Sequence, residues 1–233
     1  MEWTNAKCVI LCAGKGSRLL PDSIEKPKVM LNVHNKPILA YIIDYWRNFT
    51  DDFIFVVKFK KEEIIKYVKD MPVRSQFVEQ EELKGIANAV SYVKDKVSDN
   101  FIVVLGDCYC KGHFNFSKDM EQGIGVWETN NRDDIKQSYA VRIKDNLVSY
   151  VKEKPKRVFN NLCGMGFYFF NKKVFGYISS AKPSNIRNEI EITDVIQNMI
   201  EDGSRLVPVF FKGDYLNITY PRDLKKAEYI FSK

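Results

Sequence analysis

Short apolar runs alternate with segments of helical spacing through the first half of the chain. The runs at 7–12, 53–57 and 101–105 are almost entirely hydrophobic and rich in β-branched and aromatic residues. Such runs are typical of strands buried on both faces of a sheet. The apolar positions of 37–47 recur every three or four residues, which predicts an amphipathic helix. The same patterns give a helix over 62–68, a strand over 73–78 and a helix over 86–97.

Regular alternation of strands and helices predicts a doubly wound α/β sheet. In sheets of this kind, ligands bind in a crevice outside the carboxyl ends of the strands. Residues 14–18 follow the first predicted strand, and residues 106–107 follow the fourth. We therefore expect these two distant segments to meet in one crevice.

The second half differs from the first, because four predicted strands follow one another without alternating helices. Asp145 and Asn146 form a hairpin-type turn signal between two of these strands. We predict one domain over 1–233, in which 123–233 forms a β-rich lid on the sheet built mainly by 1–122. The expected elements are strands over 123–128, 138–143, 147–152, 162–170 and 205–211, and helices over 190–200 and 221–231.

Composition and charge narrow the function classes. The 233 residues carry a formal charge of +6 that is spread along the chain, without a basic-aromatic nucleic-acid module. No apolar run is long enough to span a bilayer, and residues 1–5 do not begin a secretory leader. Five irregularly spaced cysteines favour a reducing compartment. We expect a cytoplasmic monomer or small homo-oligomer with neither nucleic acid nor membrane as partner.

The first candidate for chemistry is a glycine loop with two cations. Gly14 and Gly16 would let the backbone approach a phosphate, while Arg18 and Lys28 supply charge. The loop is not a Walker A sequence, because Val9 and Gly16 stand where that motif needs glycine and Ser or Thr. An ordinary tight turn is the alternative interpretation of the two glycines alone.

The second candidate is the carboxylate of Asp107, which directly follows a buried strand. Beside a phosphate loop, a carboxylate suits Mg²⁺, a hard ion that prefers carboxylate, water and phosphate oxygens. A turn or capping role is the alternative interpretation of Asp107.

Ordered motifs along nearly the whole chain resemble those of the sugar-phosphate nucleotidyltransferases. The resemblance rests on their order and spacing, since each motif alone is weak evidence. The motifs occupy 11–19, 26–33, 35–39, 80–87, 105–107, 151–155, 161–169, 191–194 and 215–218.

The resemblance implies transfer of a nucleoside monophosphate from a nucleoside triphosphate (NTP) to a sugar 1-phosphate, with Mg²⁺ as cofactor. It also implies a Rossmann-like mixed sheet with a glycosyltransferase-A-like fold and a sugar-binding lid. The implied catalytic residues are Arg18 and Lys28, with Lys26 as the alternative to Lys28. The implied nucleotide contacts are Leu11, Ala13, Gly14, Gly16, Gln80 and Gly85. The implied sugar-phosphate contacts are Glu153, Lys154 and Asn161, and the implied metal ligands are Asp107 and Asn217.

Two departures from the family pattern bear on substrate choice. Asn217 stands where many members carry a second metal-binding aspartate, and Ala140 replaces a glycine that usually lies against the sugar. The altered position 140 keeps a non-sugar acceptor such as phosphocholine as an alternative substrate. A non-catalytic nucleotide-sugar-binding module is the alternative from another functional class.

Overall fold

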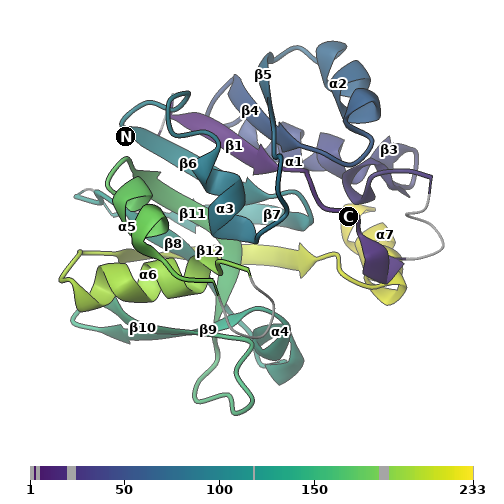
Figure 1. Ribbon diagram of the computed structural model, residues 1–233. Helices are drawn as coiled ribbons and strands as arrows, with labels where there is room; N and C mark the ends of the chain where they lie inside the picture. The colour runs from purple at the N-terminus through teal and green to yellow at the C-terminus, as the bar shows by residue number, and fades with distance from the viewer. Residues whose placement is uncertain (1–2, 4–5, 20–24, 118, 184–188, 233) are drawn as a thin grey trace.

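A computed structural model of the protein describes residues 3, 6–19, 25–117, 119–183 and 189–232, and in this part of the chain ten strands form one mixed sheet (Figure 1). The main path of the sheet runs β5 (Arg74–Glu79), β4 (Asp52–Val57), β1 (Lys7–Leu11), β6 (Asn100–Leu105), β11 (Leu162–Asn171), β8 (Gly123–Glu128), β12 (Val207–Asn217) and β7 (Cys108–Asn115). Beside this path, β9 (Tyr139–Lys144) pairs with β11 and with β10 (Leu147–Glu153).

Helices cover both faces of this sheet. In Figure 1, α3, α5 and α6 lie on the near face, and α1 lies behind the strands. The α-helices are α1 (Ile38–Trp46), α2 (Lys61–Lys69), α3 (Ile86–Ser91), α4 (Arg132–Gln137), α5 (Val174–Ser180), α6 (Ile192–Glu201) and α7 (Pro221–Phe231). Short elements are the 3₁₀ turns η1 (Ser17–Leu19) and η2 (Lys28–Met30) and the two-residue strands β2 (Asn32–Val33) and β3 (Lys36–Pro37).

The strand order reverses at β1. Strands β5, β4, β1 and β6 pair in parallel, so their carboxyl ends share one edge. β4 follows β1 in sequence on one side, whereas β6 joins β1 on the other side. β6 then pairs antiparallel with β11, which makes the sheet mixed. This reversal is the topological switch point at which doubly wound sheets bind ligands, as the sequence predicts.

Alternate residues of the central strands enter two separate hydrophobic cores. Cys8 and Ile10 of β1 pack in the core that contains α1 and α2, whereas Val9 packs in the core that contains α3, α5 and α6. Because both faces are covered, the strand sequences are continuously apolar rather than alternating. The predicted doubly wound α/β class is therefore confirmed.

One predicted helix is too long. We expected a helix over 86–97, but α3 ends at Ser91 and the chain continues in tight turns. In these turns the Val93 N–H donates to the Val90 carbonyl at 3.2 Å, a three-residue spacing. Val93 and Val97 stay buried, so helical apolar spacing persists where the helix itself does not.

The sequence analysis missed β7 and the second half of β12. β7 follows Asp107 directly, and its middle residues 111–113 are polar or glycine and exposed, which interrupts any strand pattern. Its partner, expected over 205–211, extends to Asn217 and pairs with β7 along its whole second half. Both ends of this ladder are buried, with Cys108, Cys110 and Phe114 in the core, and only its exposed middle hides the strand pattern from the sequence.

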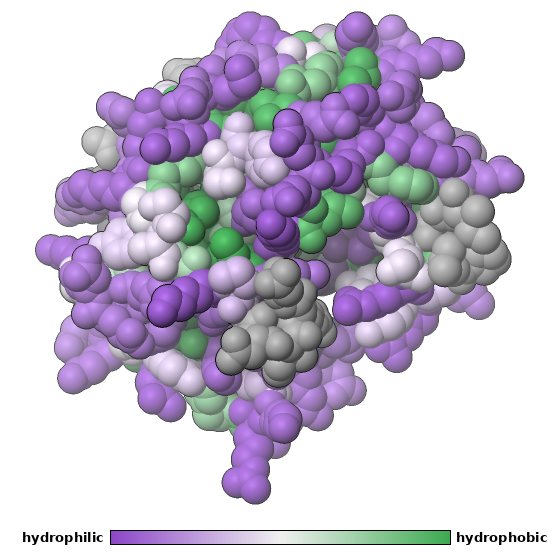
Figure 2. Space-filling view, viewed as in Figure 1, coloured by the Kyte–Doolittle hydropathy of each residue, from purple (hydrophilic) through white to green (hydrophobic). Residues whose placement is uncertain are grey.

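Smaller expectations have mixed outcomes. Asp145 and Asn146 have φ angles of 51° and 61°, as the predicted hairpin turn requires. Among the described residues, no helix is both long and apolar enough to cross a membrane, and Figure 2 shows a largely hydrophilic face.

Several predictions are not tested by the structure. Of residues 1–5, for which no secretory leader is expected, only Trp3 is described. The division at residue 122, the oligomeric state and the cytoplasmic location stay predictions.

The cysteines are expected to be unreactive in the folded protein. All five are free thiols and buried. Burial raises the pKa of each, to about 12 for Cys163. Because only the thiolate is alkylated, iodoacetamide at pH 8 should label almost no cysteine natively and all five in guanidinium. Mass spectrometry counts the labels, and rapid native labelling of any cysteine would contradict its burial.

Candidate functional site

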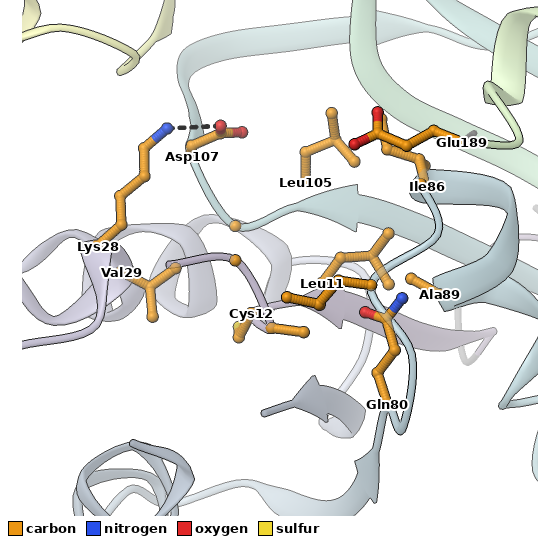
Figure 3. A pocket seen from close by; sticks show the side chains of 15 residues that line it. Leu11, Cys12, Lys28, Val29, Gln80, Ile86, Ala89, Leu105, Asp107 and Glu189 are labelled. Atoms are coloured by element: carbon orange, nitrogen blue, oxygen red, sulfur yellow. Dashed lines mark hydrogen bonds and ion pairs between the residues drawn. The ribbon is translucent and has the colours of Figure 1, made fainter. Parts of the chain in front are cut away.

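A pocket of about 340 Å³ opens at the switch point of the sheet. Its walls come from the carboxyl ends of β1 and β6, the segment after β5 and the start of α3 (Figure 3). The lining residues are Leu11, Cys12, Ala13, Gly14, Lys28, Val29, Gln80, Leu83, Gly85, Ile86, Ala89, Leu105, Gly106, Asp107 and Glu189. The predicted convergence of residues 14–18 and 106–107 is confirmed, because Gly14 and Asp107 line the same pocket.

The glycine loop continues into an adjoining cavity. Gly16 has a φ of 67°, the left-handed region that favours glycine. The Leu19 N–H donates to the Gly16 carbonyl at 2.8 Å and closes the turn that carries Arg18. The adjoining cavity is lined by Gly14, Gly16, Ser17, Arg18, Lys28, Asp107 and Thr219. Arg18 therefore lies beside the main pocket rather than in it, and the two cavities share Gly14, Lys28 and Asp107.

An ion pair closes one end of the pocket. The Lys28 Nζ donates to Asp107 Oδ2 at 2.7 Å, and the two side chains are 13% and 28% exposed (Figure 3). Lys28 begins a short turn in which the Leu31 N–H donates to the Lys28 carbonyl. Asp107 also raises the pKa of the neighbouring Cys12 thiol, after the larger effect of burial. This end of the pocket holds one cation and one carboxylate close together, which suits phosphate groups and their counter-ions.

The opposite end carries the Gln80 amide, which is held in one orientation (Figure 3). Gln80 is 3% exposed, and its Nε2 donates at 2.9 Å both to the Glu82 carbonyl and to Asn88 Oδ1. A backbone carbonyl can only accept, so the amide nitrogen must face Glu82. Both amide hydrogens are thereby engaged. The Oε1 acceptor is left as the group that this side chain offers a ligand.

Position 85 requires glycine, because neither the backbone conformation nor the space around it accommodates a side chain. Its φ is 97°, and a Cβ there would lie 2.6 Å from the Ile190 carbonyl oxygen and 3.1 Å from Glu189 Cβ. Two backbone hydrogen bonds hold Ile190 against this loop. The Ile190 N–H donates to the Lys84 carbonyl at 2.8 Å, and the Ala87 N–H donates to the Ile190 carbonyl at 3.2 Å. The loop before α3 and the segment before α6 therefore form a single unit.

The two predicted metal ligands lie at neighbouring strand ends, Asp107 in the turn just before β7 and Asn217 at the end of β12. Asn217 is opposite Cys108 in the β12 and β7 ladder, and the next N–H, that of Ile218, donates to the Asp107 carbonyl at 2.8 Å. Asn217 Oδ1 accepts from the Thr219 hydroxyl at 2.9 Å, and Asn217 lines a separate polar cavity. A carboxylate and an amide oxygen are hard donors of the kind that Mg²⁺ accepts alongside water and phosphate. The two residues therefore match the ion in donor chemistry, while their joint binding of Mg²⁺ stays a prediction.

Glu153 and Lys154 lie outside the lining of the main pocket, at the end of β10. The Lys154 Nζ donates to Glu153 Oε1 at 2.5 Å, and the Thr193 hydroxyl of α6 donates to Glu153 Oε2 at 3.2 Å. Burial raises the pKa of the nearby Tyr168 phenol most, and Tyr139, Glu153, Cys108 and Asp107 raise it further, in that order.

Two expectations about the lid fare differently. Asn161 is exposed and lines a separate cavity with Arg132 and Phe159, so the structure does not bring it to the main pocket. Its contact with a sugar stays a prediction. Ala140 is fully buried in a small cluster with Ile135 and Cys163 and is absent from the pocket lining. Its methyl group fills a core rather than reshaping the pocket.

Sequence reasoning missed two polar residues of the site, Asn88 and Glu189. Asn88 follows Gly85 by three residues, yet its bond to Gln80 depends on how the intervening loop folds. Glu189 is about a hundred positions from Gly85 in sequence, and no pattern connects them. The backbone hydrogen bonds of Ile190 with Lys84 and Ala87 bring Glu189 to the pocket.

A glycine loop, a partly buried lysine and a carboxylate at the switch point of a mixed α/β sheet are features typical of phosphate-binding α/β proteins. Comparison of the sequence with known families carries this further. The chain belongs to the nucleotidyl transferase family, whose model matches residues 7–228.

Two relatives illustrate the match. The bifunctional protein GlmU of Methanocaldococcus jannaschii is 34% identical over 226 residues, which cover 97% of this chain and 54% of that protein. The chain spans about half the length of such GlmU relatives. The UTP–glucose-1-phosphate uridylyltransferase AglF of Haloferax volcanii is 32% identical and is covered to 95%, as is this chain.

Solved structures share the fold. A UDP-glucose pyrophosphorylase complexed with UDP-glucose superposes with a TM-score of 0.86 at 21% identity, over 98% of both chains. The inositol-1-phosphate CTP transferase from T. maritima gives a TM-score of 0.84 at 22% identity, over 99% of this chain and 96% of that one. The fold is therefore that of the sugar nucleotidyltransferases.

Replacing Gly85 by alanine should destabilise the protein. The backbone at Gly85 is almost exclusive to glycine, which costs alanine about 1–3 kcal/mol, and the added Cβ would collide with Ile190. Gly176 in α5 is the control, because a Cβ there meets nothing within 4 Å. Gly176→Ala should raise stability by up to about 1 kcal/mol. Guanidinium unfolding followed by circular dichroism measures both, and an unchanged Gly85→Ala midpoint would refute the clash.

Proposed function

We propose that the protein transfers a nucleoside monophosphate from an NTP to a sugar 1-phosphate and releases pyrophosphate. The observation that carries this proposal is the shared pocket, with a fixed amide at one end and the Lys28–Asp107 pair at the other. A nucleotide is arranged in the same way from end to end, with a hydrogen-bonding base at one end and phosphates at the other. The alignment with the UTP–glucose-1-phosphate uridylyltransferase AglF covers 95% of both chains, so UTP and glucose 1-phosphate are the first substrate pair to test.

The reaction needs cations and positioning more than a general base. An oxygen of the sugar phosphate attacks the α-phosphorus, the bond to the oxygen that bridges to the β-phosphorus breaks, and pyrophosphate leaves. The attacking phosphate is already an anion, so no proton has to be removed from it. Bringing two anions together is the main barrier, and closely placed cations lower it.

The proposed roles follow the positions of the side chains. Lys28, held beside Asp107, would neutralise charge as the two phosphates approach. Arg18, on the adjoining cavity with Gly14 and Gly16, would bind the departing β- and γ-phosphates. Asp107 and Asn217 would hold Mg²⁺, which when bound stabilises negative charge on the phosphate oxygens.

The remaining predicted contacts divide between base and acceptor. Gln80 and Gly85 would contact the base, while Leu11 and Ala13 form the adjacent wall. Glu153 and Lys154 would bind the acceptor's hydroxyls and phosphate, from a position beside α6. The Glu153 carboxylate can accept hydrogen bonds from the hydroxyls of a sugar, whereas phosphocholine has no free hydroxyl to donate. A sugar phosphate is therefore the acceptor that we propose over phosphocholine.

Arg18→Ala and Asp107→Ala should each lower pyrophosphate release at least about 100-fold, the usual effect of losing a group that stabilises transition-state charge. Lys15→Ala is the control, because this exposed cation of the same loop lines neither cavity. Release is measured with Mg²⁺ across five NTPs, a panel of sugar 1-phosphates and phosphocholine. Silence across the grid, from folded protein that still binds NTP, would reject transfer in favour of a binding module.

Asn88→Ala should weaken nucleotide binding about two- to tenfold, the value of one neutral hydrogen bond, because Gln80 loses an orienting acceptor. The turnover number should stay unchanged, since the residue orients an amide at the base end. Asn88→Asp keeps the acceptor oxygen and should restore most of the affinity. Steady-state kinetics and calorimetric titration test this, and equal defects in both variants would show that Asn88 acts in some other way.

A further inference from the structure

Glu189 differs from the other charged residues that line the pocket. Lys28 and Asp107 neutralise each other at 2.7 Å. Glu189 makes no hydrogen bond or ion pair with any residue in the described part of the chain. Figure 3 shows its carboxylate beside Ile86 and Leu105, at the pocket wall. A partly buried carboxylate that has no partner in the described segments is costly unless a ligand supplies donors to it.

The position of Glu189 is fixed from the base end of the pocket. The following residue, Ile190, exchanges backbone hydrogen bonds with Lys84 and Ala87 at 2.8 and 3.2 Å. The close approach of Glu189 Cβ to Gly85 places the carboxylate within one side-chain length of the predicted base contact. The ribose is the next unit of a nucleotide after its base, joined by a single bond.

Charge decides which ligand groups can face this carboxylate. Phosphates repel it, so they belong at the Lys28 end of the pocket. An ionised carboxylate only accepts hydrogen bonds, and vicinal hydroxyls offer it two donors. Acidic side chains bind ribose hydroxyls in this way in dinucleotide-binding α/β folds. We infer that Glu189 accepts hydrogen bonds from the ribose hydroxyls and makes the site select ribonucleotides over 2′-deoxyribonucleotides, an inference that rests on the proposed function.

The test compares UTP with 2′-deoxy-UTP by calorimetric titration, without any acceptor. The wild-type protein should bind UTP at least about tenfold more tightly, as expected for a hydrogen bond to a charged group. Glu189→Ala should lower this ratio to near one, and Glu189→Gln should give an intermediate ratio. Glu81→Ala is the control, because this exposed carboxylate of the neighbouring loop has the same charge but does not line the pocket.

Three results would overturn the inference. The first is an affinity ratio for Glu189→Ala equal to that of the wild-type protein. The second is an equal fall of the ratio in Glu81→Ala, which would show that the effect comes from long-range charge alone. Glu189→Ala could also leave the ratio intact and raise only the KM for the sugar 1-phosphate, which would assign the carboxylate to acceptor hydroxyls. Because the titration needs no turnover, a protein that releases no pyrophosphate would refute the proposed function while the ribose ratio still tests Glu189.

Discussion

The close approach of β1 and β6 at their carboxyl ends determines the geometry of the site. The Gly106 N–H donates to the Leu11 carbonyl at 3.0 Å, and a Cβ at Gly106 would lie only 2.5 Å from that oxygen. This contact extends the pairing of the two strands by one step beyond β6. Residues 12–14 and Asp107 consequently leave the sheet side by side, so the glycine loop and the carboxylate share one pocket from the outset.

Much of this arrangement could be predicted from the sequence, because it depends on strongly patterned segments. Continuous apolar runs identify β1, β4 and β6, and the residues that end them, Gly14 and Asp107, identify the crevice. Buried parallel strands constrain the sequence strongly, because the side chains on both faces must be apolar. The carboxyl ends of such strands also lie at one edge of the sheet. The helix α7 likewise begins at Pro221, where a missing N–H costs nothing.

The sequence could not predict features that depend on backbone contacts between distant segments. β7 carries exposed Lys111 and His113, and its ladder with β12 is held by main-chain hydrogen bonds that no residue pattern reports. α3 ends early although Val93 and Val97 keep helical spacing, since tight turns bury the same side chains. Asn161 fits a family motif, but the motif does not report that the residue lines a cavity with Arg132 and Phe159 apart from the main pocket.

The segment from Glu189 to Thr193 links the two halves of the proposed reaction. At one end, Ile190 is hydrogen-bonded to the loop that carries Gly85, the proposed base contact. At the other end, Thr193 donates to Glu153, the proposed acceptor contact, from the first turn of α6. Four residues of backbone, Ile190 to Thr193, thus separate the two contacts. The proposed base and acceptor subsites are hydrogen-bonded to the same short segment, which relates their positions.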